Sequence, residues 1–199
     1  FFSFYPHNDT IYFIIADVAG KGIHAGMVMA KASTLFEVLA QSKVDPDEMV
    51  FHMNNDLNNT KTAGMFVTSI VGEYNLITDE IRWVNAGHQP AILRNGQGKY
   101  DQFESSAPPL GVIKQKDKSV YNIHKTKLNG SRFYAFTDGL SESLNDNGEE
   151  IGIDGSIGII EQNYNKDTVK QLDSITQSVI GTSENQKLSD DLTLISIGK

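Results

Sequence analysis

Hydrophobic positions change their spacing along the chain, and these changes predict a fold that mixes helices and strands. Residues 1–5 begin in a strand pattern, and a polar turn then leads to a continuous apolar run at 11–16, which indicates a strand buried on both faces. From about residue 23 to 42 the apolar positions recur at helical spacing. Pro46 then opens a second helical pattern that continues to about residue 59.

The middle of the chain carries strand patterns joined by short polar turns. We expect strands at residues 65–74, 80–85, 91–94, 100–103, 119–125 and 132–137. Trp83 falls on the buried face of its strand, and Asn95-Gly96 is a strong signal for a hairpin turn. Toward the C-terminus the pattern predicts a helix at about 167–180 and a final strand at 192–197.

Composition restricts the classes of protein that fit this pattern. The 199 residues carry a net charge of −8, which argues against nucleic acid as a partner, because clustered Lys and Arg bind phosphate backbones. The chain contains no cysteine, so it has no disulfide, thiolate zinc site or cysteine nucleophile, and it fits a reducing, cytoplasmic compartment. No uninterrupted apolar run approaches the roughly 20 residues that cross a bilayer, so we expect no membrane contact by this domain.

Three acidic residues share one context, because Asp17, Asp138 and Asp190 each stand at the end of an apolar strand. If these strands belong to one β-sandwich, the three carboxylates can converge at one edge. Carboxylates ~4 Å apart repel by about 4 kcal/mol per pair at an effective dielectric near 20, so such a cluster requires protons or hard cations. Oxygen-only ligands favour Mg²⁺ or Mn²⁺, and two such ions activate a bridging water for hydrolysis without a protein nucleophile.

Each candidate residue also has a plainer interpretation. Asp17 precedes a helical pattern and is equally compatible with an ordinary helix N-cap. His88 invites a catalytic role, but its place in a strand-ending turn favours structural hydrogen bonding. Lys21 lies between two glycines without the spacing of a P-loop, so we expect a solvated turn residue. The polar stretch at 145–150 lacks the ligand spacing of a calcium loop and is expected to be solvated.

Five short motifs stand in order along nearly the whole chain. They are Asp17-Val18-Ala19-Gly20-Lys21-Gly22, Asn85-Ala86-Gly87-His88-Gln89-Pro90, Pro109-Leu110-Gly111-Val112, Phe136-Thr137-Asp138-Gly139-Leu140 and Asp190-Asp191-Leu192-Thr193. Together they resemble the metal-dependent protein Ser/Thr phosphatases of the PPM family, in its bacterial SpoIIE/RsbU-like branch. The resemblance implies an α+β fold, a β-sandwich of two antiparallel sheets flanked by α-helices, with a two-metal phosphatase site at one end.

The resemblance also implies roles for individual residues. Asp17 would bridge two divalent cations, Mn²⁺ or Mg²⁺, and the Val18 carbonyl would bind one of them. Asp138 and Asp190 would supply the remaining protein ligands. In this reading Asp17, Asp138 and Asp190 act in catalysis through metal-activated water. Asp191 would orient these ligands from outside the metal shell.

Gly139 fits the family pattern, because it would let the chain turn tightly after Asp138. Two other features depart from the pattern. Members of the branch carry a Gly-Gly-Asp-aromatic-Tyr-Asp segment before the point where this chain begins. We therefore expect a single phosphatase domain over residues 1–199, truncated at its N-terminus and lacking one metal-binding acid. Ala19 stands where relatives outside the branch carry a histidine proton donor, so protonation of the leaving group falls to water or another residue.

The resemblance further implies a phosphorylated protein substrate, with phosphoserine or phosphothreonine on a regulatory protein such as a STAS-domain anti-sigma-factor antagonist. It also implies an upstream sensor or dimerisation domain in the full-length protein and is compatible with a homodimer. The main alternative is a catalytically silent interaction module with the same fold. A phosphodiesterase or another two-metal hydrolase is a further alternative.

Overall fold

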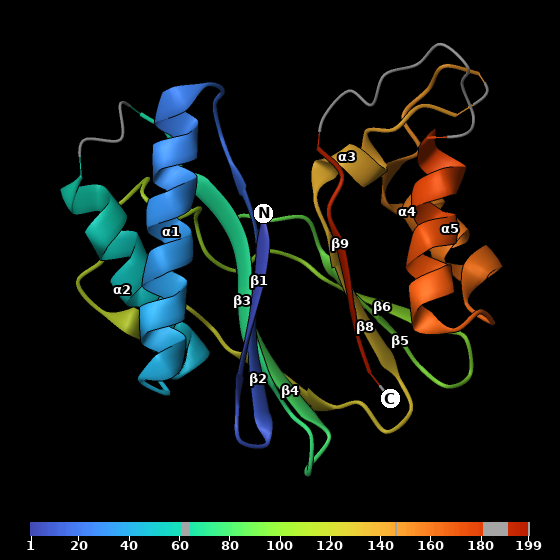
Figure 1. Ribbon diagram of the computed structural model, residues 1–199, viewed down its shortest axis with the longest axis horizontal. Coiled ribbons are helices and arrows are strands. Elements are labelled where there is room, and N and C mark those ends of the chain that lie inside the picture. Colours follow the sequence, from blue (N-terminus) through green and yellow to red (C-terminus); the bar gives the residue numbers. More distant parts are fainter. Residues whose placement is uncertain (61–63, 146, 181–190, 199) are drawn as a thin grey trace. The chain divides into compact units, whose positions relative to one another are not determined.

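The computed structural model describes residues 1–60, 64–145, 147–180 and 191–198, and the chain divides into two compact units. Unit 1 comprises Phe1–Ala91 and Phe103–Asn129, and unit 2 comprises Ile92–Gln102 and Gly130–Lys199. Each unit combines an antiparallel sheet with helices (Figure 1). Two antiparallel sheets and the helices that accompany them confirm the predicted α+β class.

The sheet of unit 1 has the strand order β1-β2-β3-β4-β7. Its strands are β1 (Phe2–His7), β2 (Thr10–Val18), β3 (Val67–Asn75), β4 (Glu80–Ala86) and β7 (His124–Lys127). β2 pairs with β3 along its whole length, and this register places Asp17 directly opposite Thr68. The predicted strand at 11–16 is therefore the centre of a longer strand that carries Asp17 at its end.

Two helices, α1 (Ile23–Gln41) and α2 (Pro46–Asn59), cover one face of this sheet (Figure 1). The core beneath them is formed by Tyr12, Ile14 and Ala16 of β2, Val28, Ala32, Phe36 and Ala40 of α1, and Met49, Val50, Met53 and Leu57 of α2. Side chains alternate between the two faces of a strand, so the even-numbered residues of β2 face the helices. Asp17 is odd-numbered and therefore points to the opposite face of the sheet.

Within the described residues, helix α1 is long and apolar enough to cross a membrane, judged by length and composition alone. Core helices of soluble proteins share these two properties. In unit 1 the buried residues of α1 pack in the core between the helices and the sheet. The absence of membrane contact by this domain stays a prediction.

Unit 2 contains a sheet with the strand order β6-β5-β8-β9. The strands are β5 (Ala91–Arg94), β6 (Tyr100–Phe103), β8 (Arg132–Phe136) and β9 (Leu194–Ile197), and the helices are α3 (Asp138–Ser141), α4 (Gly152–Asn163) and α5 (Thr168–Ile180). Its core joins residues of the sheet and of all three helices, namely Ile92, Tyr134, Phe136, Leu140, Ile160, Ile175 and Val179. Helices α3 and α4 were not predicted from the sequence.

One local prediction is wrong in detail. The strand expected at 119–125 begins only at His124, because the Asp117 carboxylate accepts a hydrogen bond from the Ser119 amide (2.7 Å) and starts a 3₁₀ turn, η1 (Lys118–Val120). The hairpin predicted at Asn95-Gly96 is confirmed between the neighbouring strands β5 and β6, and Gly98 (φ 79°) is a left-handed residue of its turn. The Asn95 side chain accepts hydrogen bonds from the amides of residues 97 and 99 and so sets a longer turn.

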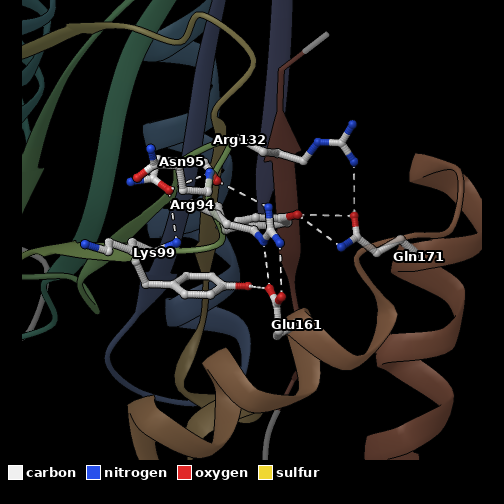
Figure 2. Close-up of polar contacts among 9 residues, drawn as sticks. Arg94, Asn95, Lys99, Arg132, Glu161 and Gln171 are labelled. Carbon is white, nitrogen blue, oxygen red and sulfur yellow. Dashed lines mark hydrogen bonds and ion pairs between the residues drawn. The ribbon is translucent and has the colours of Figure 1, made fainter.

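Arg94, at the end of β5, joins the sheet of unit 2 to helix α4 (Figure 2). Its guanidinium donates two hydrogen bonds to Glu161, from Nε to Oε2 (2.7 Å) and from Nη2 to Oε1 (3.0 Å). The Tyr100 hydroxyl donates to the same carboxylate, and the Tyr164 ring centroid lies 3.3 Å from the guanidinium carbon. Hydrogen bonds from Arg94 and then from Tyr100 lower the pKa of Glu161 from 4.5 to about 2.

A second polar contact joins the same sheet to helix α5 (Figure 2). Gln171 is fully buried, and its Nε2 donates to the Tyr134 hydroxyl (3.0 Å). Its Oε1 accepts from Nη1 of Arg132 (3.2 Å). Each end of the carboxamide is therefore paired, as a buried polar group requires.

Replacement of Glu161 by Gln should destabilise the protein at neutral pH and lose this effect in acid. The lowered pKa of Glu161 means that its carboxylate stabilises the folded state above about pH 4.5, and that this contribution disappears as the pH falls toward 2. Urea unfolding of wild type and Glu161→Gln at several pH values measures the difference. The exposed Asp101 of β6, changed to Asn, serves as the control. A difference that is constant from neutral pH to about pH 3 would contradict stabilisation of the Glu161 carboxylate by Arg94 and Tyr100.

Candidate functional site

Asp17 is the second-to-last residue of β2 and is half-buried. The chain turns through Gly20 (φ 126°) and Gly22 (φ 83°) before α1 starts, and Gly22 is the residue that precedes the helix. Asp17 is therefore not the N-cap of α1, so the structure excludes that alternative. Lys21 is exposed in this turn, which confirms a solvated turn residue.

Thr68 lies opposite Asp17 on the same face of the sheet, and its side chain is hydrogen-bonded to His88. Directly opposite residues of an antiparallel pair share a face, with Cβ atoms roughly 4.5–5.5 Å apart, so Thr68 is the cross-strand neighbour of Asp17. The Thr68 Oγ1 is 2.8 Å from Nδ1 of His88, whose side chain is 6% exposed. The structural hydrogen bonding expected of His88 is confirmed.

The turn that follows β4 delivers His88 to this position. The buried Asn85 side chain accepts a hydrogen bond from the His88 amide (2.9 Å) and donates one to the Gln89 carbonyl (3.0 Å). Gly87 has a φ of 71°, and a Cβ at this position would come within 2.3 Å of the Pro109 ring. The motif at residues 85–90 therefore packs against the motif at residues 109–112.

The third motif also contacts the end of β3. The Leu110 amide donates to the Val67 carbonyl (2.8 Å), and the Val67 amide donates to the Leu110 carbonyl (2.9 Å). The Asn54 side chain of α2 accepts from the Gly111 amide (3.0 Å) and donates to the Ile113 carbonyl (3.0 Å). Helix α2 thus holds the connector against the strand that pairs with Asp17.

In unit 2 the motif at residues 136–140 contacts Asp191 and Thr193 of the last motif at the end of β8. Thr137 is almost fully buried, its hydroxyl donates to the Asp191 carbonyl (2.9 Å), and its oxygen accepts from the Thr193 amide (2.9 Å). Asp138 follows at once as the first residue of α3 and is half-buried. The structure therefore brings the backbone at Asp191 against the motif that carries Asp138.

Gly139 follows Asp138 in the first turn of the four-residue helix α3, directly after β8. A Cβ on Gly139 would be 2.6 Å from the Asp191 carbonyl oxygen, so a glycine is required for this close approach.

The predicted ligands are thus distributed over both units, with Asp17 and Val18 in unit 1 and Asp138 in unit 2. Asp190 lies outside the described residues. Among the described residues no group of three or more His, Asp and Glu side chains is arranged to hold a metal. Convergence of Asp17, Asp138 and Asp190 stays a prediction, while the donor chemistry of carboxylate and carbonyl oxygens fits Mg²⁺ or Mn²⁺.

The sequence analysis did not identify Thr68, opposite Asp17, or Thr137, next to Asp138, as candidate site residues. Thr68 gave no signal of its own, because its place opposite Asp17 depends on pairing between distant strands. Thr137 was visible as a polar residue at the end of an apolar strand, within the motif that carries Asp138. A search for hydroxyl residues next to the acidic strand ends finds Thr137 but not Thr68.

Comparison with known proteins identifies the class of this fold. The PP2C domain of SiaA from Pseudomonas aeruginosa superposes with a TM-score of 0.84 at 14% identity, over 98% of this chain and 78% of that chain. RsbX, solved in complex with magnesium, gives a TM-score of 0.70 at 21% identity, over 98% of this chain and 84% of that one. The fold is therefore that of PP2C phosphatase domains.

The family follows from the sequence itself. The family described as "Stage II sporulation protein E (SpoIIE)" matches residues 7–198, and the chain belongs to this SpoIIE family. The phosphoserine phosphatase RsbU of Bacillus subtilis is 26% identical over 199 residues, which cover 98% of this chain and 57% of RsbU. The chain thus spans little more than half the length of this curated relative.

Replacement of Gly87 by Ala should lower the stability of the protein by at least about 2 kcal/mol, because the left-handed backbone and the contact with Pro109 both exclude a methyl group. Thermal unfolding measures this loss as a fall of several degrees in Tm. Gly96→Ala is the matched control, since its added methyl meets no atom within 4 Å. Equal melting temperatures of the two variants would contradict the geometry of this turn.

Proposed function

We propose that this chain is a metal-dependent protein phosphatase domain that hydrolyses phosphoserine or phosphothreonine on a regulatory protein. The observation that supports this most is the SpoIIE family match over residues 7–198, which includes all five motifs. RsbU, a phosphoserine phosphatase, is similar over nearly the whole chain.

The residues that would hold two divalent cations are Asp17, the Val18 carbonyl, Asp138 and Asp190. All of their donor atoms are oxygens, which suits Mn²⁺ or Mg²⁺, and the magnesium complex of RsbX supports this choice. When bound, such cations lower the pKa of a coordinated water and polarise the phosphoryl oxygen.

The chain's own residues prepare the site for these cations. Asp17 supplies its negative charge from a strand whose register is fixed on both sides, by β1 and by β3. Asp138 supplies its charge from a helix start that Thr137 holds against the backbone of Asp191 and Thr193. The net charge of −8 repels a phosphate ester. Binding of the substrate therefore depends on the divalent cations that these carboxylates would hold.

The proposed substrate is a phosphorylated regulatory protein, with a STAS-domain anti-sigma-factor antagonist as the leading choice. Support comes from the similarity to RsbU and from the fold shared with 53% of a Mycobacterium tuberculosis chain whose structure contains RsbU and RsbW domains. We further propose that an upstream sensor or dimerisation domain controls the activity in the cytoplasm.

Removal of one carboxylate from either unit should abolish hydrolysis. We expect Asp17→Asn and Asp138→Asn each to lower kcat/KM by more than about 100-fold, since even partners outside the metal shell commonly change affinity or activity by 10–100-fold. Manganese-dependent hydrolysis of p-nitrophenyl phosphate and of a phosphoserine STAS protein measures the loss.

Asp9→Asn is the control for Asp17, because Asp9 is exposed and precedes the opposite end of the same strand. Asp154→Asn, on an exposed position of α4, is the control for Asp138. Folded wild-type protein that hydrolyses no phosphoester with Mn²⁺ would favour the silent interaction module. Turnover of phosphodiesters but not of phosphoserine would favour another two-metal hydrolase.

Addition of Mn²⁺ should raise the melting temperature of the wild type. A ligand at about 100 times its Kd adds about 2.7 kcal/mol of stability, which corresponds to a rise of about 5–10 °C for a chain of this size. Differential scanning fluorimetry with and without Mn²⁺ measures the shift. Asp138→Asn should reduce the rise and Asp154→Asn should preserve it. An undiminished rise in Asp138→Asn would argue against Asp138 as a ligand.

A further inference from the structure

Two asparagine side chains of helix α2 fix the backbone of the connector that follows β6. Asn54 accepts a hydrogen bond from the Gly111 amide and donates one to the Ile113 carbonyl (3.0 Å each). Asn55 makes the same two kinds of contact with the amide and the carbonyl of Gln115 (2.9 and 3.0 Å). Because all four contacts use backbone atoms of the connector, its path along α2 is set without its own side chains.

The connector passes close to the end of the strand that carries Asp17. Val67, the first residue of β3, pairs with Val18 on one side and with Leu110 on the other. The amide and the carbonyl of Val67 are both hydrogen-bonded to Leu110 (2.9 and 2.8 Å). The connector therefore leaves the sheet one strand away from the end of β2, where Asp17 lies.

Two adjacent apolar side chains of the connector are exposed at this place, Val112 by 49% and Ile113 by 56%. Single exposed apolar residues are common on protein surfaces and need no explanation. Here the contacts of Asn54 and Asn55 hold the backbone at residues 111, 113 and 115, so the segment cannot turn these side chains inward. Both are β-branched, so few rotamers are lost when a partner covers them.

The charge of the connector is opposite to that of the whole chain. Residues 111–118 contain three lysines and one aspartate, a net charge of +2 in a chain of −8. Lys118 is paired with two acidic residues of α2, whereas Lys114 donates to a neutral carboxamide of that helix (2.8 Å) and Lys116 is exposed. The positive charges next to the apolar pair are complementary to a partner with negative charge.

We propose that Val112, Ile113, Lys114 and Lys116, together called the connector surface, bind the phosphorylated substrate protein. The partner that fits is the protein carrying the phosphoserine, through an apolar patch with acidic side chains beside it. The inference rests on the proposed function, which supplies the phosphoprotein, and adds the place where that protein docks. Because the connector surface is separate from the carboxylates, it favours protein substrates over small phosphate esters.

The first experiment compares a phosphoserine STAS protein with p-nitrophenyl phosphate as substrates of the full chain in Mn²⁺. The double variant Val112→Ser/Ile113→Ser should raise KM for the phosphoprotein and lower its kcat/KM by about tenfold, the size of a central apolar contact in an interface. Its kcat/KM for p-nitrophenyl phosphate should stay within about twofold of the wild type, as expected of an independent site.

The matched control is Leu76→Ser/Ile77→Ser. Leu76 and Ile77 are also adjacent, apolar and exposed (42% and 72%), but they lie in the turn between β3 and β4, at the other end of β3. This variant should hydrolyse both substrates like the wild type.

The second experiment tests the charge of the connector surface. In the wild type, KM for the phosphoprotein should rise as salt increases from about 50 to 300 mM, because salt screens exposed charges. Lys116→Glu should raise KM at low salt and weaken this salt dependence. Lys43→Glu, at an exposed position after the C-terminal end of α1, makes the same change in net charge and should have little effect. Equal effects of the two variants would overturn the proposal, since net charge alone would then explain them.

Binding of the phosphoprotein, measured by biolayer interferometry without Mn²⁺, separates this inference from the proposed function. Binding that Val112→Ser/Ile113→Ser weakens, in a wild type that hydrolyses neither substrate with Mn²⁺, overturns the function and supports the connector surface. Phosphoprotein hydrolysis that is unchanged in this variant upholds the function and overturns the inference. A wild type that neither binds nor hydrolyses the phosphoprotein overturns both.

Two further outcomes would assign the connector surface to something else. Equal losses on both substrates, at an unchanged melting temperature, would show that the connector acts on the metal site rather than on the docked protein. A wild-type dimer that Val112→Ser/Ile113→Ser converts to a monomer in analytical ultracentrifugation, with unchanged phosphoprotein kinetics, would show that a second copy of the chain covers the surface. Either result overturns the proposal.

Discussion

Carboxylates at the ends of buried strands impose an electrostatic constraint on this chain. A carboxylate that is half-removed from water loses solvation, and like charges in the same neighbourhood repel unless a cation or a proton compensates them. Asp17 and Asp138 are both half-buried, and each directly follows a buried stretch of its strand. In the proposed function, divalent cations bound by these residues compensate their negative charge.

The uncharged residues of the short motifs determine the backbone positions of the acidic residues. None of the neighbouring glycines, prolines or amides carries charge, yet they determine where the charged residues lie. Gly87 and Pro109 pack in one turn, and Gly139 admits the backbone of Asp191 beside α3. Asn85 and Thr137 use buried hydrogen bonds to fix the two chain reversals next to the acidic residues. These contacts fix the turns in which the motif residues lie, as a preorganised site requires.

Local patterns predicted those parts of the chain that are decided by local chemistry. The apolar run before Asp17, the helical spacing of α1 and the proline at the start of α2 all gave the right elements. Helix α4 was missed because Gly152, Gly155 and Gly158 weaken its helical signal, while the buried Ile160 holds it in the core of unit 2. The start of β7 was misplaced because a single carboxylate, Asp117, caps a turn within an extended-looking segment.

Some residues of the candidate site could likewise be predicted from local sequence, and others could not. The acidic residues and His88 stand in recognisable motifs, so the sequence indicates them directly. Thr68 could not be found, since only the register between β2 and β3 makes it a neighbour of Asp17. A residue whose role depends on long-range pairing leaves no trace in the spacing of its own segment.

The central claim is the proposal that Asp17 and Asp138 both bind the divalent cations of the phosphatase reaction. Anomalous diffraction from crystals grown with Mn²⁺ tests it most directly, because the manganese positions are located independently of the protein coordinates. The account predicts two neighbouring peaks, with the carboxylates of Asp17 and Asp138 both bound to them. Manganese peaks bound by only one of these side chains, or found away from both, would contradict it.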